Sequence, residues 1–249
     1  MDAVSIIISK KHLPEVVDFR AGLMLLIDKP KDWTSFDVVN KIRYKVKHKL
    51  GVKKIKVGHA GTLDPMATGL LLVCVGRYTK LIDSLQGMDK SYDGIIKLGA
   101  TTPSYDAETE EDALYPIDGI DMAQLSRAAA SFVGDIEQVP PIFSALKVDG
   151  VRLYKKARKG QTVEIKPRPV TIHKFDITSY EPPYAHFSSA VSKGTYVRSM
   201  AYDLGRKLDN GGYLTALRRT LVGPYTADTS LTVDEAVAWI ENCELISES

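Results

Sequence analysis

Strand-like and helix-like segments follow one another along this chain without the regular rhythm of a doubly wound sheet, and this order restricts the fold most. Residues 23–27 and 70–75 are apolar runs of strand length, and a helix is expected to begin at Thr34 or Ser35. The other expected elements are strands at 92–98, 170–180, 185–191 and 213–222 and helices at 79–85, 122–132, 196–208 and 233–243. This mixture predicts an α+β fold.

The composition is that of a globular protein with a sizeable core. Of 249 residues, 44% are hydrophobic and 26% are charged, so one domain over residues 1–249 is expected to fold without metal or disulfide. Cys74 and Cys243 have no ligand or redox spacing. No apolar run approaches the roughly 18 residues of a membrane span, and the apolar stretch at 6–8 is too short for a signal peptide. We expect a cytoplasmic protein without a membrane partner.

Charge is distributed unevenly, although the net charge is only +2. Residues 1–60 hold 13 Lys or Arg against 6 Asp or Glu, residues 144–174 hold 9 against 2, and residues 220–249 hold 6 acidic residues and no Lys or Arg. Because a polyanion responds to the local field, this pattern suits RNA on some faces only. The alternative is that Lys41, Lys45, Lys47 and Lys49 form the solvated side of a helix.

The turn from Gly58 to Gly69 contains one carboxylate, Asp64, five positions after His59. Its glycines permit unusual backbone angles and close approach, and Pro65 biases Asp64 away from helical geometry. Asp64, on a loop just before a strand, is therefore the candidate reacting group. The alternative is a stiff Asp-Pro turn whose carboxylate bonds its own backbone.

This turn resembles the catalytic segment of TruB-type tRNA pseudouridine synthases, and four further segments agree in the family's order. They are Leu-Leu-Ile-Asp-Lys-Pro at 25–30 with Trp-Thr-Ser at 33–35, Lys-Ser-Tyr at 90–92, Asp-Ile-Glu-Gln-Val-Pro at 135–140 with Ser-Ala-Leu-Lys at 144–147, and Ser-Lys-Gly-Thr-Tyr-Val-Arg at 192–198. The resemblance implies the pseudouridine synthase fold, a mixed and mostly antiparallel sheet flanked by helices. It also implies an RNA-gripping insertion at about 135–165, where residues 153–159 suggest a basic helix. The C-terminal PUA-type RNA-binding domain of fuller members is expected to be missing.

The resemblance implies that Asp64 acts on a uridine whose bond from N1 to C1′ breaks before the uracil rejoins through C5. An ionised carboxylate would serve as nucleophile or electrostatic partner, and the sequence leaves open attack at the sugar, attack at the base and elimination. By the family's pattern Arg198 would pair with Asp64 and keep it charged. Tyr92 would stack on the uracil. The alternatives are a surface strand arginine that grips phosphate and a half-buried strand tyrosine.

A stacked uridine must be flipped out, and His59 is the candidate that braces the space it leaves. The alternative for His59 is a residue that only bonds the backbone. By the family's motif Tyr196 would line the pocket. Lys29, Lys147 and the basic stretch that begins at Arg152 are expected to meet phosphates, which position RNA without reading its sequence.

The leading hypothesis is a stand-alone isomerase of the T-loop uridine at position 55 of tRNA, with the T-arm as its RNA partner. The isomerisation transfers no electrons or groups from outside, so no cofactor or metal is expected. The rivals are an RNA-binding protein without chemistry, a nucleosidase that uses Asp64, and a dyskerin-type enzyme that depends on a guide RNA. We expect no obligatory protein partner or guide RNA.

Overall fold

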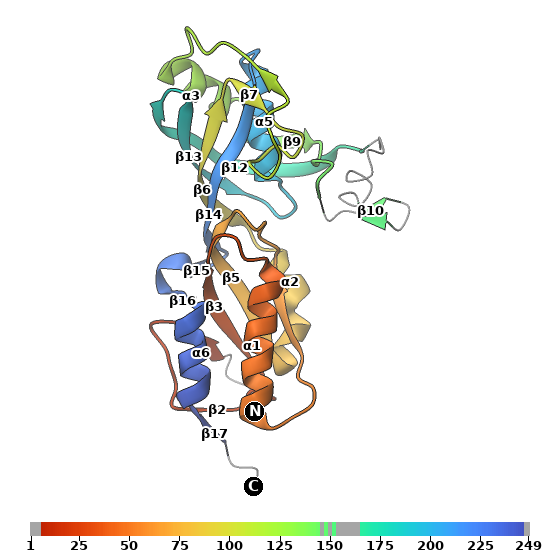
Figure 1. Ribbon diagram of the computed structural model, residues 1–249, viewed down its shortest axis with the longest axis vertical. Coiled ribbons are helices and arrows are strands. Elements are labelled where there is room, and N and C mark those ends of the chain that lie inside the picture. Colours follow the sequence, from red (N-terminus) through yellow and green to blue (C-terminus); the bar gives the residue numbers. More distant parts are fainter. Residues whose placement is uncertain (1–5, 145–146, 149–150, 153–164, 247–249) are drawn as a thin grey trace. The chain divides into compact units, whose positions relative to one another are not determined.

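The computed structural model describes residues 6–144, 147–148, 151–152 and 165–246, and its chain forms two compact units (Figure 1). Unit 1 consists of Met1–Lys90 and Arg218–Ser249, and unit 2 of Ser91–Leu217. Strand β14 (Gly212–Val222) contains the point at which the chain returns to unit 1. The expectation of one catalytic domain over the whole chain stays a prediction.

Two strands form the centre of unit 1. Strand β3 (Leu23–Lys29) runs antiparallel to β5 (Thr68–Val75), from the pair Leu23 and Val75 to the pair Lys29 and Gly69. Almost every residue of both strands is buried, as continuous apolar runs indicate when both faces of a sheet are covered. The strands expected at 23–27 and 70–75 are therefore confirmed.

The remaining strands of unit 1 extend this pair. Strands β1 (Ile6–Ile8) and β16 (Leu231–Thr232) run parallel to β3, and β4 (Val57–Ala60) runs antiparallel to β5. The end of β14 runs parallel to β5 and forms a short hairpin with β15 (Tyr225–Thr226). Strand β2 (Val16–Val17) pairs with β17 (Glu244–Leu245), and the 3-10 turn η2 spans Ala227–Thr229.

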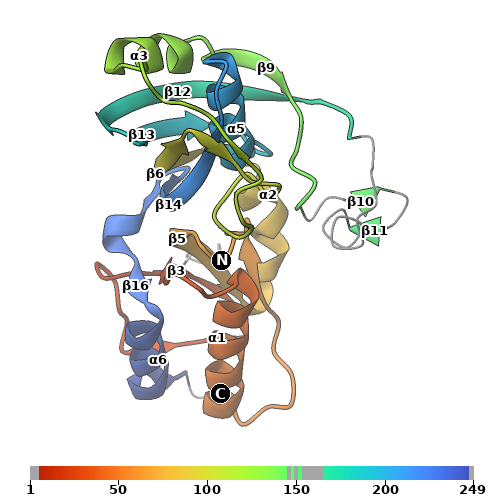
Figure 2. The same cartoon turned by 45° about the horizontal axis from the view of Figure 1, so that its top comes forward.

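Helices cover both faces of this sheet. Helix α1 (Ser35–Leu50) and helix α6 (Val233–Asn242) lie side by side on one face, where they bury an apolar cluster that includes Ile42 and Ile240 (Figures 1 and 2). The other face packs against η1 (Gly76–Leu81) and α2 (Ile82–Gln86). Instead of the single helix expected at 79–85, the chain forms a 3-10 turn followed by a short α-helix.

Unit 2 contains the strand order β14–β6–β13–β12–β9, with residues 212–217 as its part of β14. The strands are β6 (Lys90–Leu98), β13 (Tyr184–Val191), β12 (Arg168–Glu181) and β9 (Gly134–Gln138), and the last three pair antiparallel. Helix α3 (Met122–Ala130) packs on β12, and α5 (Val197–Lys207) contacts α3. Short hairpins join β7 (Ala100–Thr101) to β8 (Ala113–Leu114) and β10 (Lys147–Val148) to β11 (Val151–Arg152).

The predicted α+β class with a mixed, mostly antiparallel sheet is confirmed. The basic helix expected at 153–159 lies outside the described residues, and so does part of the insertion expected at 135–165. Among the helices that the structure describes, none is long and apolar enough to span a membrane.

One glycine fixes the packing at the start of β5. Gly69 has a φ of +97°, and a Cβ built on it would lie 2.3 Å from the backbone oxygen of Arg219. The close approach that the glycine-rich turn predicts is therefore made here by the chain itself, because β14 passes directly against β5.

We expect Gly69→Ala to lower the free energy of unfolding by about 2 to 5 kcal/mol, since a strained φ and a clash with backbone act together. Gly119→Ala is the matched control, because Gly119 has a φ of +82° but no atom within 4 Å of the added Cβ. Urea unfolding of both variants tests the prediction. Equal losses in the two variants would show that the contact with β14 carries no energy.

Candidate active site

The loop that carries Asp64 connects β4 to β5 and is attached to the start of α1 within unit 1. The Ser35 hydroxyl accepts a hydrogen bond from the Leu63 amide (2.8 Å) and donates one to the Leu63 carbonyl (3.1 Å). The Asp32 amide donates to the Pro65 carbonyl (2.8 Å). These bonds hold the backbone on both sides of Asp64. The start of the helix therefore fixes the position of the Asp64 backbone, from which the partly exposed carboxylate extends.

Lys29 lies beneath this loop and is fully buried. Its ammonium donates to the carbonyls of Pro30 (2.9 Å), Trp33 (2.6 Å) and Pro65 (3.3 Å). Burial lowers its pKa to about 8, while the negative charges of Asp64 and Asp32 act in the opposite direction. This interior position differs from the phosphate contact that the sequence suggests, because the ammonium already donates its hydrogen bonds to backbone carbonyls. We assign Lys29 to the support of the Asp64 loop.

Arg219 is the second buried cation at this loop, with 1% of its surface exposed. Its Nε donates to the Leu70 carbonyl (2.7 Å) and its Nη2 to the Gly61 carbonyl (3.0 Å). Two positive charges thus lie next to the backbone around Asp64 and favour negative charge there. Arg219 is not among the residues predicted from the sequence. Its signal is the pair Arg218-Arg219 inside the strand expected at 213–222, because a buried arginine requires internal partners.

His59 lies on strand β4, opposite Val73 of β5, and not in the turn itself. Burial and the nearby charge of Arg219 lower its pKa. Within the part of the chain that the structure describes, its Nδ1 is buried without a hydrogen-bond partner. The lowered pKa favours the neutral imidazole, which retains one buried polar atom without a partner among the described residues. The bracing role expected for His59 stays a prediction.

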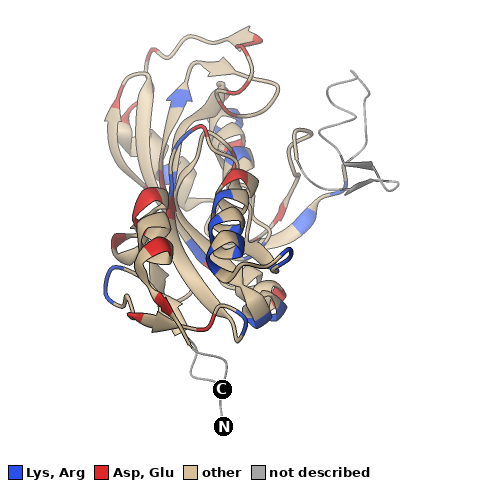
Figure 3. Ribbon diagram, turned by 60° about the horizontal axis from the view of Figure 1, so that its bottom comes forward, with Lys and Arg blue, Asp and Glu red and all other residues tan. Residues whose placement is uncertain are grey.

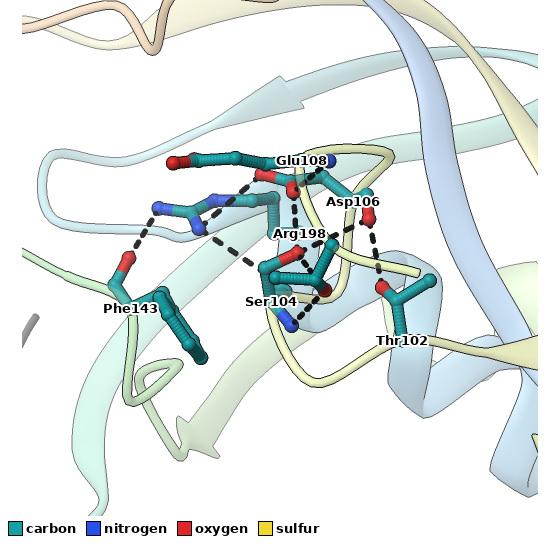
Figure 4. A network of polar contacts seen from close by, with 7 residues as sticks. Thr102, Ser104, Asp106, Glu108, Phe143 and Arg198 are labelled. Carbon is teal, nitrogen blue, oxygen red and sulfur yellow. Dashed lines mark hydrogen bonds and ion pairs between the residues drawn. The ribbon is translucent and has the colours of Figure 1, made fainter. Parts of the chain in front are cut away.

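Arg198 occupies the first turn of α5 in unit 2 and is buried, with 6% of its surface exposed. Figure 4 shows its guanidinium between two backbone segments. One nitrogen donates to the Ser104 carbonyl (3.2 Å) and another to the Phe143 carbonyl (2.9 Å). The same guanidinium forms an ion pair of 3.3 Å with Asp106. The alternative of a surface strand arginine is wrong.

Asp106 has no exposed surface, and hydroxyl groups surround it. Its Oδ1 accepts hydrogen bonds from the Ser104 hydroxyl (2.6 Å) and the Glu108 amide (3.0 Å), and its backbone carbonyl accepts one from Thr102 (2.7 Å) (Figure 4). Residues 99–119 are acidic and rich in Thr, Pro and Asp, a composition typical of an exposed connection, but Asp106 is buried. Its signal is an acid flanked by several hydroxyl residues, which can satisfy a buried carboxylate.

Two segments singled out in the sequence contact each other in unit 2. The Tyr196 amide donates to Gln138 Oε1 (2.8 Å), and Gln138 Nε2 donates to the Tyr196 carbonyl (3.1 Å). Tyr92 lies on β6 with 8% of its surface exposed. Lys147 and Arg152 belong to β10 and β11, and their side chains lie outside the described residues.

The candidate residues thus fall into two groups, one in each unit. Unit 1 holds Asp64 with Lys29, and unit 2 holds Arg198 with Asp106. The pairing of Asp64 with Arg198 or Tyr92 stays a prediction, because these residues belong to different units. Among the residues described here, no three His, Cys, Asp or Glu side chains gather as a metal site.

Comparisons with known proteins define the family. The TruB family pseudouridylate synthase model for the N-terminal domain matches residues 47–197. The tRNA pseudouridine synthase B of Flavobacterium johnsoniae is 50% identical over 217 residues, which cover 87% of this chain and 95% of that protein. The enzyme of the same name from Parabacteroides distasonis is 48% identical over 225 residues, 90% of this chain and 96% of the relative.

Solved structures agree on the class of fold. The crystal structure of a Cbf5-Nop10-Gar1 complex contains a chain that matches with a TM-score of 0.66 and 26% identity over 88% of this chain. The match covers 54% of the solved chain, so this chain spans about half of its length. The family match and these relatives together define a pseudouridine synthase, an isomerase. The chain belongs to the TruB family of pseudouridylate synthases.

Arg198 and Asp106 are expected to stabilise unit 2 only when both residues are present. Arg198→Met and Asp106→Asn should each cost about 3 to 5 kcal/mol of unfolding free energy, because each leaves one charge buried without its partner. The double variant should lose less than the sum of the two single losses. Urea unfolding of all four proteins gives this coupling energy. Additive losses would contradict a direct pair.

Lys29 is expected to make stability depend on pH. Since its pKa in the folded chain is about 8 and its ordinary value is 10.5, the unfolded chain binds more protons between these values. The free energy of unfolding therefore rises with pH in this range. The stability gained by deprotonation of Lys29 is lost again as pH falls to about 8. The free energy of unfolding of wild type, minus that of Lys29→Met, should therefore increase as pH rises above 8. Parallel profiles would contradict the burial of a titrating amine.

Proposed function

We propose that this protein converts uridine to pseudouridine in tRNA, at position 55 of the T-loop. One observation carries the proposal: relatives named tRNA pseudouridine synthase B match over 95% and 96% of their own length at 50% and 48% identity. The two matches also cover 87% and 90% of this chain. Asp64 is the proposed catalytic carboxylate.

The proposed chemistry needs one stable anion. The glycosidic bond from N1 to C1′ breaks, the uracil turns, C5 bonds to C1′, the C5 proton leaves to solvent and N1 takes up a proton, so atoms and electrons balance without a cofactor. Attack at the sugar, attack at the base and elimination each use an ionised carboxylate. The positive charges of Lys29 and Arg219 near the Asp64 loop support that ionised state.

The flipped base requires groups that hold it. Arg198 is proposed to meet the Asp64 carboxylate, and its contacts with Ser104, Phe143 and Asp106 would orient the guanidinium beforehand. Tyr92 would stack on the uracil and Tyr196 would line the pocket. The neutral imidazole of His59, whose Nδ1 is free among the described residues, would brace the gap in the RNA.

The remaining parts of the proposal concern partners and place. Lys147 and Arg152 would contact phosphates of the T-arm. The proposed enzyme works as one catalytic domain on bare tRNA in the cytoplasm, without guide RNA or protein partner. The length match to relatives named tRNA pseudouridine synthase B supports independence from a guide. The Cbf5 complex is a structural neighbour at only 26% identity.

We expect Asp64→Asn to fold, to bind tRNA and to form no product, because the amide keeps the shape and removes the charge. The measurement is tritium release from tRNA labelled at uridine C5, without added guide or partner. Asp176→Asn, at an exposed aspartate of unit 2, is the control and should retain full activity.

Three results would reject the proposal. Full turnover by Asp64→Asn would remove Asp64 from the chemistry. Release of free uracil would indicate a nucleosidase. Binding of tRNA without tritium release by wild type would indicate a binding protein or dependence on a guide.

A further inference from the structure

Helix α1 carries a row of exposed aromatic and half-buried basic side chains that the proposed chemistry does not use. Its members lie on one side of the helix, and we name them the α1 stripe: Phe36, Asn40, Arg43, Tyr44 and Lys47. Successive members are four, three, one and three residues apart. The opposite side of α1, with Val38, Val39, Ile42 and Val46, is buried in the core. Phe36 is 59% exposed and Tyr44 is 65% exposed.

Arg43 is held in a defined position within the α1 stripe. Its guanidinium donates to Asn40 Oδ1 (2.8 Å) and to the Val57 carbonyl (3.1 Å), and lies 5.7 Å from the centre of the Phe36 ring. These contacts use only part of its donors. Val57 begins strand β4, which carries His59. The stripe is therefore attached to the strand that leads into the Asp64 loop.

Two sides of α1 differ in how their charges are balanced. Lys45 forms an ion pair with Glu241 of α6, and Lys49 donates to the Glu241 carbonyl (2.7 Å). Lys47, in the α1 stripe, forms no ion pair with any residue that the structure describes. Figure 3 shows Lys and Arg along α1 and acidic residues on α6. Among the described residues, Lys47 thus lies without an acidic partner on the side of α1 that bears the aromatic rings.

The chain that follows α1 continues this positive surface. Lys53, Lys54 and Lys56 are all exposed between α1 and β4. Exposed aromatic rings beside cations fit a nucleic acid, because bases and riboses pack on rings while cations neutralise phosphates. A protein partner fits less well, since the surface that it would desolvate holds several charges.

We propose that the α1 stripe binds the sugar-phosphate backbone and an unpaired base of the tRNA next to the reacting nucleotide. Ser35, at the start of α1, bonds the Asp64 loop, and Lys47 lies about 18 Å along the helix from it at 1.5 Å per residue. The stripe therefore contacts nucleotides beside the flipped uridine and not the uridine itself. This inference rests on the proposed tRNA substrate.

The test compares matched variants on the two sides of α1 and on an unrelated surface. Lys47→Gln and Tyr44→Ala change the stripe. Lys45→Gln removes the same charge on the α6 side, and Tyr184→Ala removes another exposed tyrosine, which is 43% exposed. Binding of fluorescent tRNA is measured by anisotropy at several salt concentrations, and tritium release gives KM and kcat.

We expect Tyr44→Ala to raise Kd about tenfold and Lys47→Gln to reduce the slope of log K against log salt by about 1. KM should rise in both variants while kcat stays near the wild-type value. The two controls should bind like wild type. Unchanged Kd and salt slope in both stripe variants would overturn the inference.

Two further outcomes are separable. If the stripe variants bind tRNA normally but change the mass of the protein in solution, the stripe is a protein contact and the inference is wrong. If wild type binds tRNA without tritium release, the proposed function fails while the binding isotherms still decide the role of the stripe.

Discussion

Buried cations that bind backbone carbonyls are the interaction on which the candidate site depends. Lys29 and Arg219 hold the loop around Asp64, and Arg198 holds the segments that contain Ser104 and Phe143. A buried charge is costly unless its donors are satisfied, so each cation requires these carbonyls in place. The loops gain a fixed geometry from this requirement. A reaction that needs an oriented carboxylate benefits directly from such order.

Different parts of the chain provide the rigid support and the polar groups of the candidate site. The apolar centre of unit 1, formed by β3, β5, α1 and α6, supplies a rigid support. The polar groups at the ends of these elements then place the chemistry, since the Asp64 loop is bonded to the start of α1 and to the end of β3. Unit 2 repeats this logic at the start of α5, where Arg198 and Asp106 lie. Rigid helices and strands thus position functional groups that lie in the short connections between them.

The sequence predicts those features that depend on local pattern. The apolar runs predict β3 and β5, helix-start signals predict the start of α1 at Thr34 or Ser35, and β-branched and aromatic residues predict the strands β12 and β13. Lys29 and Asp106 are assigned to the wrong environments, because Lys-Pro and Thr-Pro-Ser segments are typical of surface turns. Their burial depends on partners far away in the chain, such as Pro65 and Arg198. No local pattern contains that information.

We propose that an ionised Asp64 faces the everted uridine with the Arg198 guanidinium beside it. The most direct measurement is a crystal structure of the protein bound to a T-arm RNA. We expect a carboxylate oxygen of Asp64 within about 4 Å of a guanidinium nitrogen of Arg198, the distance of an ion pair. An Asp64 side chain directed to bulk solvent and far from both Arg198 and Tyr92 would contradict the account.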